Sequence, residues 1–153
     1  MNRKEKALKL YANGFNCSQV IIASFADLLD LNEEKAILMA SGFGGGMGKM
    51  QNTCGAITGS YMVIGFLRGK FVEENKVSNE ESGILVREFT KRFTEIHKST
   101  NCKALIKFDI GTKEGMEEAV KAEVFKKKCS SYIITAIEIL EDILSLPNTI
   151  IKK

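Results

Sequence analysis

The sequence predicts an all-α fold, and three observations support this class. The chain of 153 residues contains only one proline, Pro147, and few runs in which β-branched residues alternate with polar ones. Its apolar residues recur at helical spacing almost throughout. Residues that cap helix N-termini precede several of these segments. We therefore expect one domain, residues 1–153, built as a single bundle of about six to eight helices. A Gly-rich loop leads into a central helix, and no sheet is expected beyond an isolated bridge.

Three helices are expected in the first part of the chain. The spacing of apolar residues predicts them over residues 3–12, 18–29 and 33–41. Asn32 is the expected N-cap of the third helix. The two glutamates that follow it favour the positive end of the helix dipole.

Five further helices are expected after the Gly-rich loop. The central helix is predicted over residues 54–67, and Ser78-Asn-Glu-Glu81 matches a capping box that opens a long helix. Short helices follow Asn101 and Thr112, and the last helix begins near residue 129 or 130 and stops at the proline. The expected buried stripes are Leu85, Phe89, Phe93 and Ile96 in the long helix, and Ile133, Ile137, Leu140 and Leu144 in the last.

Composition and charge exclude several classes of function. The net charge is only +3 at pH 7, and basic residues cluster only at 126–128 and at the chain end, with no aromatic platform beside them. No nucleic-acid partner is therefore expected. The uncharged stretch 50–67 is too polar for a transmembrane segment and is better explained as a buried helix. The first residues do not form a secretory signal, so we expect a cytoplasmic protein with reduced thiols.

The four cysteines are the main functional signal. Cys17, Cys54, Cys102 and Cys129 form no C-x-x-C pair, which argues against zinc-ribbon and thioredoxin-type motifs. No C-x-x-C-H motif is present either, so covalent c-type haem is not expected. In a reducing compartment, four cysteines indicate redox or metal chemistry more than a disulfide framework. A site that they share has to be assembled by the fold.

The residues beside the cysteines favour thiolates. Asn16, Thr53 and Asn101 are typical N-caps, and each precedes a cysteine. A helix N-terminus offers unpaired N–H groups and a positive partial charge, which stabilise a thiolate. Cys129 instead follows the three lysines 126–128. The alternative is that the cysteines are unreactive core residues, since free cysteine is often buried.

The loop Gly42-Phe-Gly-Gly-Gly-Met-Gly48 does not match a phosphate-binding loop. Phe43 stands where a Walker loop needs glycine, and Met50 stands where it needs Ser or Thr. So many glycines instead indicate positive φ or close backbone approach. The loop would then cover the start of the central helix and direct amides at a thiolate or a cofactor; a flexible connection is the alternative. The candidate cofactor-binding residues are Gly44, Gly45, Gly46, Gly48, Thr53 and Gly55.

The cysteines and the loop together form an ordered set of motifs along most of the chain. They are Cys17 in NCSQ, Gly44-Gly-Gly-Met-Gly48, Cys54-Gly-Ala-Ile-Thr-Gly59, Cys102 in NCKALIKFD, and Cys129 in VFKKKC. This set resembles the small family of redox-active proteins labelled C_GCAxxG_C_C. The resemblance implies an α-helical domain and a redox role that involves the cysteines.

The first functional hypothesis is thiol–disulfide or electron-transfer chemistry with an unknown redox partner. An enzyme of this kind would be a thiol-dependent oxidoreductase in which Cys54 is the most thiolate-like nucleophile. Cys17 is the first choice of partner for Cys54, and Cys102 and Cys129 form the second pair. The single histidine, His97, is expected on the surface near a helix end rather than as a catalytic base.

Two other functions remain open. The same four cysteines could ligate an iron–sulfur cluster or zinc, which makes Cys17, Cys54, Cys102 and Cys129 the candidate metal ligands. A helical interaction protein with buried, unreactive cysteines is the third hypothesis. The oligomeric state is open, and a homodimer is one alternative.

Overall fold

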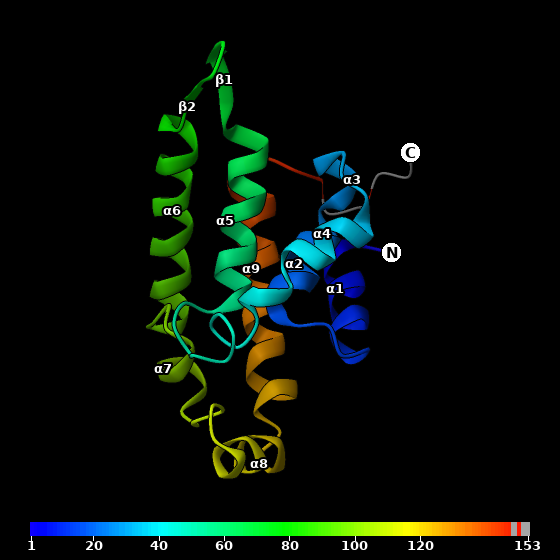
Figure 1. The fold of residues 1–153 in the computed structure, drawn as a ribbon, viewed down its shortest axis with the longest axis vertical. Coiled ribbons are helices and arrows are strands. Elements are labelled where there is room, and N and C mark those ends of the chain that lie inside the picture. Colours follow the sequence, from blue (N-terminus) through cyan, green and yellow to red (C-terminus); the bar gives the residue numbers. More distant parts are fainter. Residues whose placement is uncertain (148–149, 151–153) are drawn as a thin grey trace.

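The computed structural model describes residues 1–147 and 150, and it confirms the all-α class (Figure 1). In Figure 1, α5, α6 and α9 run along the long axis, α1 to α4 lie to one side, and α7 and α8 lie at one end. Within the described residues the elements are α1 (Arg3–Ala12), α2 (Cys17–Ser24), α3 (Ala26–Leu29), α4 (Glu33–Met39), the 3₁₀ turn η1 (Ser41–Phe43), α5 (Gly55–Arg68), β1 (Lys70–Glu73), β2 (Lys76–Ser78), α6 (Glu80–His97), α7 (Cys102–Ile106), α8 (Lys113–Lys121), the π-helical turn η2 (Phe125–Cys129) and α9 (Ser130–Ile143).

The fold differs from the prediction at a strand hairpin and within the second predicted helix. Strands β1 and β2 form an antiparallel hairpin in which Phe71 pairs with Val77. The sequence did not indicate this hairpin, because its strands have only four and three residues and expose most side chains, so no buried face marks them. The predicted helix 18–29 is divided at Phe25, whose backbone angles (φ −113°, ψ 6°) lie outside the helical range. The described residues therefore contain nine α-helices, one more than the eight segments predicted.

Asparagine and threonine side chains start five helices. Asn2, Asn16, Asn32, Asn101 and Thr112 each accept a hydrogen bond from the backbone N–H three residues further on, over 2.9 to 3.1 Å. Each bond satisfies one of the N–H groups that a helix start leaves without an intrahelical partner. These caps depend only on neighbouring residues, which is why the sequence indicated most of them correctly.

Helix α6 differs from its prediction at both ends. Its N-cap is Asn79, whose side chain makes no capping bond, so the expected capping box at residues 78–81 is wrong. Phe89 and Phe93 are fully buried as expected, but Ile96 is 59% exposed. The buried stripe is therefore shorter than the apolar spacing suggests.

Helix α5 lies at the centre and packs against α2, α6 and α9. Gly59 allows the backbone of α2 to approach, because a Cβ at this position would lie 3.0 Å from Ile21 Cβ and from the carbonyl oxygen of Ser18. Ala56 and Ser60 on the same helix are fully buried. This close packing brings together the starts of α2 and α5, where two of the cysteines lie.

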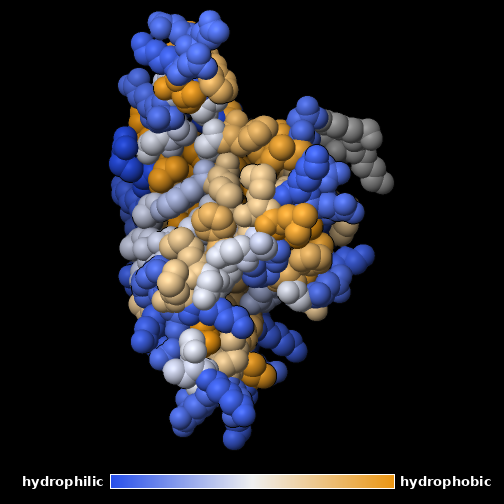
Figure 2. Space-filling model, viewed as in Figure 1, coloured by the Kyte–Doolittle hydropathy of each residue, from blue (hydrophilic) through white to orange (hydrophobic). Residues whose placement is uncertain are grey.

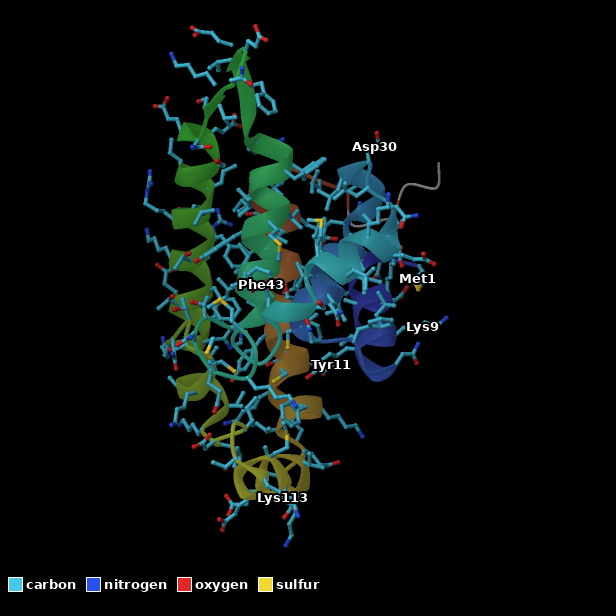
Figure 3. The ribbon with its side chains drawn as sticks, viewed as in Figure 1. Met1, Lys9, Tyr11, Asp30, Phe43 and Lys113 are labelled. Carbon is cyan, nitrogen blue, oxygen red and sulfur yellow. The ribbon has the colours of Figure 1, made fainter. Side chains whose placement is uncertain are left out.

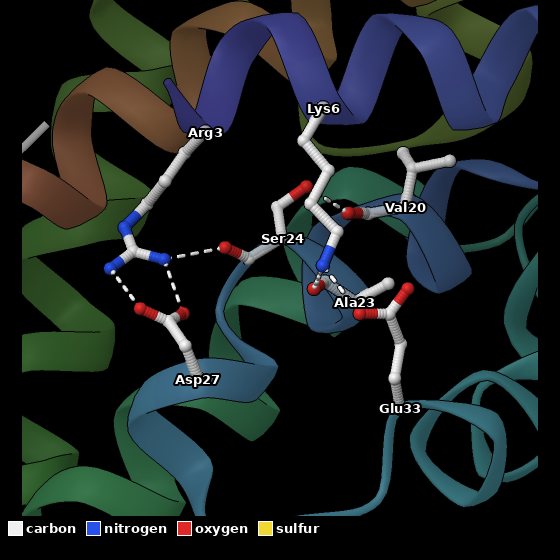
Figure 4. A network of polar contacts seen from close by, with 7 residues as sticks. All are labelled: Arg3, Lys6, Val20, Ala23, Ser24, Asp27 and Glu33. Atoms are coloured by element: carbon white, nitrogen blue, oxygen red, sulfur yellow. Dashed lines mark hydrogen bonds and ion pairs between the residues drawn. The ribbon is translucent and has the colours of Figure 1, made fainter. Parts of the chain in front are cut away.

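A polar network joins α1 to the α2–α4 region (Figure 4). The side chain of Arg3 is fully buried, and its Nη1 donates to the Ser24 carbonyl oxygen and to Asp27 Oδ1, both at 2.6 Å. Its Nη2 donates to Asp27 Oδ2 at 2.9 Å, which makes the ion pair bidentate. Nearby, Lys6 Nζ contacts Glu33 Oε2 at 2.5 Å.

In the view of Figure 2, hydrophilic residues dominate both ends of the long axis, and hydrophobic residues gather over its middle part. Among the described residues, none of the helices combines the length and the apolar character that a membrane span requires.

Candidate functional site

A short antiparallel contact brings two cysteines together. The N–H of Cys54 donates to the carbonyl oxygen of Thr100 at 2.9 Å, and the N–H of Cys102 donates to that of Asn52 at 2.7 Å. Cys54 is the N-cap of α5, and Cys102 is the first residue of α7. The two helix starts therefore lie side by side although they are far apart in the sequence.

The third cysteine, Cys17, joins them through the packing of α2 on α5. Its preceding residue, Asn16, caps α2 and also donates from Nδ2 to the Ser41 carbonyl oxygen at 3.0 Å. A Cβ at Gly55 would lie 3.1 Å from Cys17 Cβ, so the absence of a side chain at this glycine lets the two helix starts meet.

The fourth cysteine reaches the site on a π-helical turn. Cys129 is the last residue of η2, has helical backbone angles and continues directly into α9. A π turn holds an extra residue and changes the direction in which side chains point, and such turns are frequent at functional sites. Cys129 therefore lies between the π turn and α9, and the start of α9 at Ser130 confirms the expected helix start near this residue.

All four cysteines line one cavity of about 840 Å³. Tyr11 and Tyr132 also line it, as do several residues of the Gly-rich loop. This confirms that Cys54 converges with other cysteines. Of the six candidate cofactor-binding residues, five line the cavity and Thr53 does not; the five are Gly44, Gly45, Gly46, Gly48 and Gly55.

The Gly-rich loop covers this cavity in a left-handed conformation. Gly45, Gly46 and Gly48 have φ values of 63°, 69° and 58°, and the residues at 47 and 49 also have positive φ. A Cβ at Gly46 would lie only 2.8 Å from Cys102 Cβ and 2.6 Å from the Asn52 nitrogen. The prediction that these glycines adopt positive φ or pack against backbone near the cysteines is confirmed.

Gln51 holds the loop in place, a role that the sequence did not reveal. It is 5% exposed, its Nε2 donates to the Phe108 carbonyl oxygen at 2.6 Å, and its Oε1 accepts from the Ile110 N–H at 3.0 Å. Its own N–H donates to the Gly45 carbonyl oxygen at 3.0 Å. The only signal in the sequence was a polar residue next to an apolar helix.

Burial controls the protonation of Cys54 and Cys102. Burial raises the pKa of the Cys54 thiol to about 12, and the N–H groups of Ala56 and Ile57 offset only part of this increase. Burial likewise raises the pKa of Cys102 to about 11. The helix N-terminus acts on Cys54 in the expected direction, but desolvation is the larger effect. The expectation that Cys54 is the most thiolate-like cysteine is therefore wrong.

Cys129 is the thiol whose environment favours the anion. A hydrogen-bonding contact with Cys17 lowers the pKa of Cys129, and Tyr11 and Lys128 lower it further against the effect of burial. The same contact, together with burial, raises the pKa of Cys17 well above its ordinary value. Burial and the two cysteines also raise the pKa of Tyr11, so its phenol stays protonated and can donate.

Figure 3 places Tyr11 on the side of α1 that faces the bundle, whereas Lys9 on the same helix points outward. All four cysteines are free thiols. The thiol with the largest effect on the pKa of Cys17 is that of Cys129, and the expected pairing of Cys17 with Cys54 stays a prediction. Nothing in the sequence singled out Tyr11, because a tyrosine near a helix end carries no motif.

The expected metal ligands do not form a ligand set as they stand. Zinc and iron–sulfur clusters are held by several thiolates gathered around one centre. In the described part of the chain, no group of three or more Cys, His, Asp or Glu side chains is arranged to hold a metal ion. The four thiols share a cavity, but they would have to rotate or move to share a metal.

His97 lies in an aromatic cluster rather than on the surface. Its ring centroid is 4.8 Å from those of Phe93 and Tyr132, and its Nε2 lies 2.9 Å from Thr135 Oγ1. It is half-buried, and burial lowers its pKa. The expected surface position of this histidine is corrected accordingly.

The raised pKa of Cys54 predicts a loss of stability in alkali. The unfolded chain releases the thiol proton first, near a pKa of about 8.5, so the free energy of unfolding falls as pH rises from there toward the folded pKa of about 12. At about pH 10 the contribution of Cys54 to this loss should be about 2 kcal/mol. Urea unfolding of the reduced protein at about pH 8 and pH 10 measures it, and Cys54→Ala should lose correspondingly less. An equal decline in both proteins would contradict the prediction.

The fold and the site define a helical protein in which four free cysteines line a cavity beneath a left-handed glycine loop. A family model described as "Putative redox-active protein (C_GCAxxG_C_C)" matches residues 15–143, which is most of the chain and includes all four cysteines. The chain therefore belongs to this family. No curated protein and no solved structure matches the chain significantly.

Proposed function

We propose that the protein is a thiol–disulfide oxidoreductase in which Cys129 is the nucleophile and Cys17 the resolving thiol. The observation that carries this proposal is that Cys17 and Cys129 line the same cavity, where the interaction between them lowers the pKa of Cys129 and raises that of Cys17. Cys129 is thereby the thiol that releases its proton more readily, and Cys17 is the one that holds its proton more tightly. Membership of a redox-active family supports the same conclusion.

The reaction follows from this asymmetry. The Cys129 thiolate attacks one sulfur of a disulfide substrate, a new S–S bond forms, and the other substrate sulfur leaves as a thiolate that takes up a proton. Cys17 then loses its proton and attacks the Cys129 sulfur, which releases the second substrate thiol. The substrate gains two electrons and the Cys17–Cys129 pair becomes a disulfide. An external thiol restores the dithiol by the reverse exchange.

A cluster- or metal-binding function is the second candidate. One observation favours it, namely that all four cysteines line the same cavity. The lack of a preformed ligand group among the described residues opposes it. Anaerobic purification with metal analysis distinguishes the candidates, because iron or zinc bound in a fixed ratio to protein would favour this second function.

Alkylation of the reduced protein tests the proposed nucleophile. Cys129 should be labelled first by iodoacetamide, with a midpoint of the pH–rate profile below the ordinary cysteine pKa of about 8.5. Mass-spectrometric mapping should locate the label at Cys129, and a disulfide between Cys17 and Cys129 after mild oxidation. Cys129→Ser should slow the fast labelling by about 100-fold, since the remaining thiols are mostly protonated.

Cys54→Ser is the matched control for this experiment. Its cysteine lines the same cavity but has a raised pKa, so the variant should keep the fast labelling phase. If Cys54→Ser loses the fast phase and Cys129→Ser retains it, the assignment of the nucleophile is wrong.

Tyr11→Phe tests how the Cys129 thiolate is stabilised. Removing the phenol removes a hydrogen bond that lowers the pKa of Cys129, and a bond to a charged group contributes about 1.5 to 3 kcal/mol. The midpoint of the pH–rate profile should therefore rise by about one unit or more. Tyr61→Phe is the control, because the Tyr61 hydroxyl contacts Thr90 instead. An unchanged midpoint in Tyr11→Phe would show that the tyrosine does not act on the nucleophile.

A further inference from the structure

We infer that the disulfide substrate is a small, largely apolar molecule with an acidic group, which reacts inside the cavity, and that it is not a disulfide of another protein. This inference rests on the proposed thiol–disulfide function and adds the class of substrate. It is carried by the enclosure of the thiols, the size and lining of the cavity, and the charge around it.

The enclosure of the thiols argues against a protein substrate. Cys54, Cys102 and Cys129 are only 5%, 7% and 6% exposed, and Cys17 is half-buried. Thiol–disulfide exchange requires the attacking sulfur to come into direct contact with a sulfur of the disulfide. A disulfide held in a folded protein brings two backbone segments with it, and these cannot follow it to a nucleophile buried to this extent.

The size and lining of the cavity fit a small organic molecule. Its volume of about 840 Å³ lies within the range of about 300 to 1,000 Å³ typical of small-molecule sites. Such sites are mostly apolar, with a few polar groups that orient the ligand. The apolar lining residues here include Leu8, Phe15, Leu105, Ile110, Met116 and Phe125.

The charged and polar groups at the cavity favour an anion. Lys49 and Lys126 are exposed residues that line it, and the described lining contains no Asp or Glu. The N–H groups of Gly45 and Gly46 in the covering loop donate to no described residue. Two lysines and two available amides can pair with a carboxylate or similar group while the apolar walls hold the rest of the molecule.

The reaction on such a substrate is the balanced exchange given above. The Cys129–sulfur bond forms as the substrate S–S bond breaks, and the Cys17–Cys129 bond forms as the mixed disulfide breaks. One molecule of disulfide is converted to two molecules of thiol, and the protein dithiol loses two electrons.

Stopped-flow oxidation of the reduced protein by three disulfides tests the inference. The probes are dithiobis(nitrobenzoate), which is aromatic and anionic, cystamine, which is aliphatic and cationic, and insulin, which is a protein. The rate constant for oxidation of the protein by each disulfide is divided by the rate constant for the reaction of glutathione with the same disulfide. This normalisation is needed because the probes differ in intrinsic reactivity. The normalised rate should be highest for dithiobis(nitrobenzoate), about tenfold or more above cystamine, and lowest for insulin. A normalised rate with insulin equal to or above that with dithiobis(nitrobenzoate) would overturn the inference, and equal rates for the two small probes would overturn its charge preference.

A variant that fills the cavity provides an independent measurement. Met116 lines the cavity and is half-buried. Met116→Trp should therefore slow oxidation of the protein by dithiobis(nitrobenzoate) by about tenfold, whereas the rate of alkylation by the much smaller iodoacetamide should change little. Met39→Trp is the matched control, because Met39 is 59% exposed and does not line the cavity. If Met116→Trp does not fold, the comparison of the three disulfides on the wild-type protein still decides.

Failure of the proposed function would look different from failure of this inference. If Cys129→Ser were oxidised by every disulfide at the wild-type rate, the nucleophile itself would be wrong. If Cys129→Ser were inactive but wild type had its highest normalised rate with insulin, the proposed thiol chemistry would be supported and only the proposed substrate class would be wrong.

Discussion

Replacing Asp27 by alanine should lower the free energy of unfolding by about 3 to 5 kcal/mol, because it leaves a buried guanidinium without its carboxylate. Arg3 is fully buried, and two of its nitrogens donate to Asp27 at 2.6 and 2.9 Å. The guanidinium also lies 4.8 Å from the centre of the Phe25 ring, so it cannot easily move to water. Urea unfolding near neutral pH measures the change.

The matched control is an exposed ion pair that joins the same helix, α1, to α9. Lys4 Nζ contacts Glu138 Oε1 at 2.9 Å, but the two side chains are 37% and 54% exposed. Glu138→Ala should therefore change stability by about 1 kcal/mol or less. Equal losses in the two variants would show that burial does not set the energy of the Arg3–Asp27 pair.

The second large effect is expected at Gly46, where alanine should destabilise the protein by about 2 to 5 kcal/mol. Its φ of 69° is unfavourable for a residue with a side chain, and the added Cβ would lie 2.6 Å from the Asn52 nitrogen and 2.8 Å from Cys102 Cβ. Because the neighbour is backbone, the loop has to move to relieve the overlap. The movement also displaces Cys102, so Cys102 should become more accessible to alkylation than in wild type.

Gly48→Ala separates backbone strain from overlap. Gly48 has a similar φ of 58°, but a Cβ there would meet no atom within 4 Å. Gly48→Ala should lower the free energy of unfolding by only about 1 to 2 kcal/mol, through the unfavourable φ alone, and leave the labelling of Cys102 unchanged. If the two alanine variants lost equal stability, the overlap at Gly46 would be relieved at no cost and the loop would not constrain Cys102.

The helix starts show which structural features can be predicted from neighbouring residues alone. Asn16 and Asn101 cap α2 and α7 as predicted, because the capping bond joins residues only three positions apart. Thr53 was predicted by the same rule and does not cap α5, since Cys54 itself is the N-cap. Here Thr53 instead forms an isolated bridge with Asn101, and a pairing between residues so distant in sequence leaves no local signal.

The pKa values of the cysteine thiols depend on contacts between residues far apart in the chain, which the sequence alone does not reveal. A lysine next to Cys129 was visible, and Lys128 does lower its pKa. The larger influence comes from Cys17, more than a hundred positions earlier, and a further one from Tyr11. For Cys54 the helix start was visible, but burial by distant segments outweighs it and reverses the predicted protonation.

The sequence by itself determined the all-α class, most helix starts, the left-handed glycine loop and the four cysteines as the functional residues to examine. These follow from interactions over a few residues: apolar spacing, capping bonds and the freedom of glycine at positive φ. Only the tertiary structure decided that Cys17 and Tyr11 act on the pKa of Cys129 and that burial raises the pKa of Cys54. The physical reason is that desolvation and sulfur–sulfur contacts depend on which distant segments surround a thiol, and the packing of α1, α2, α5 and η2 around one cavity sets that environment.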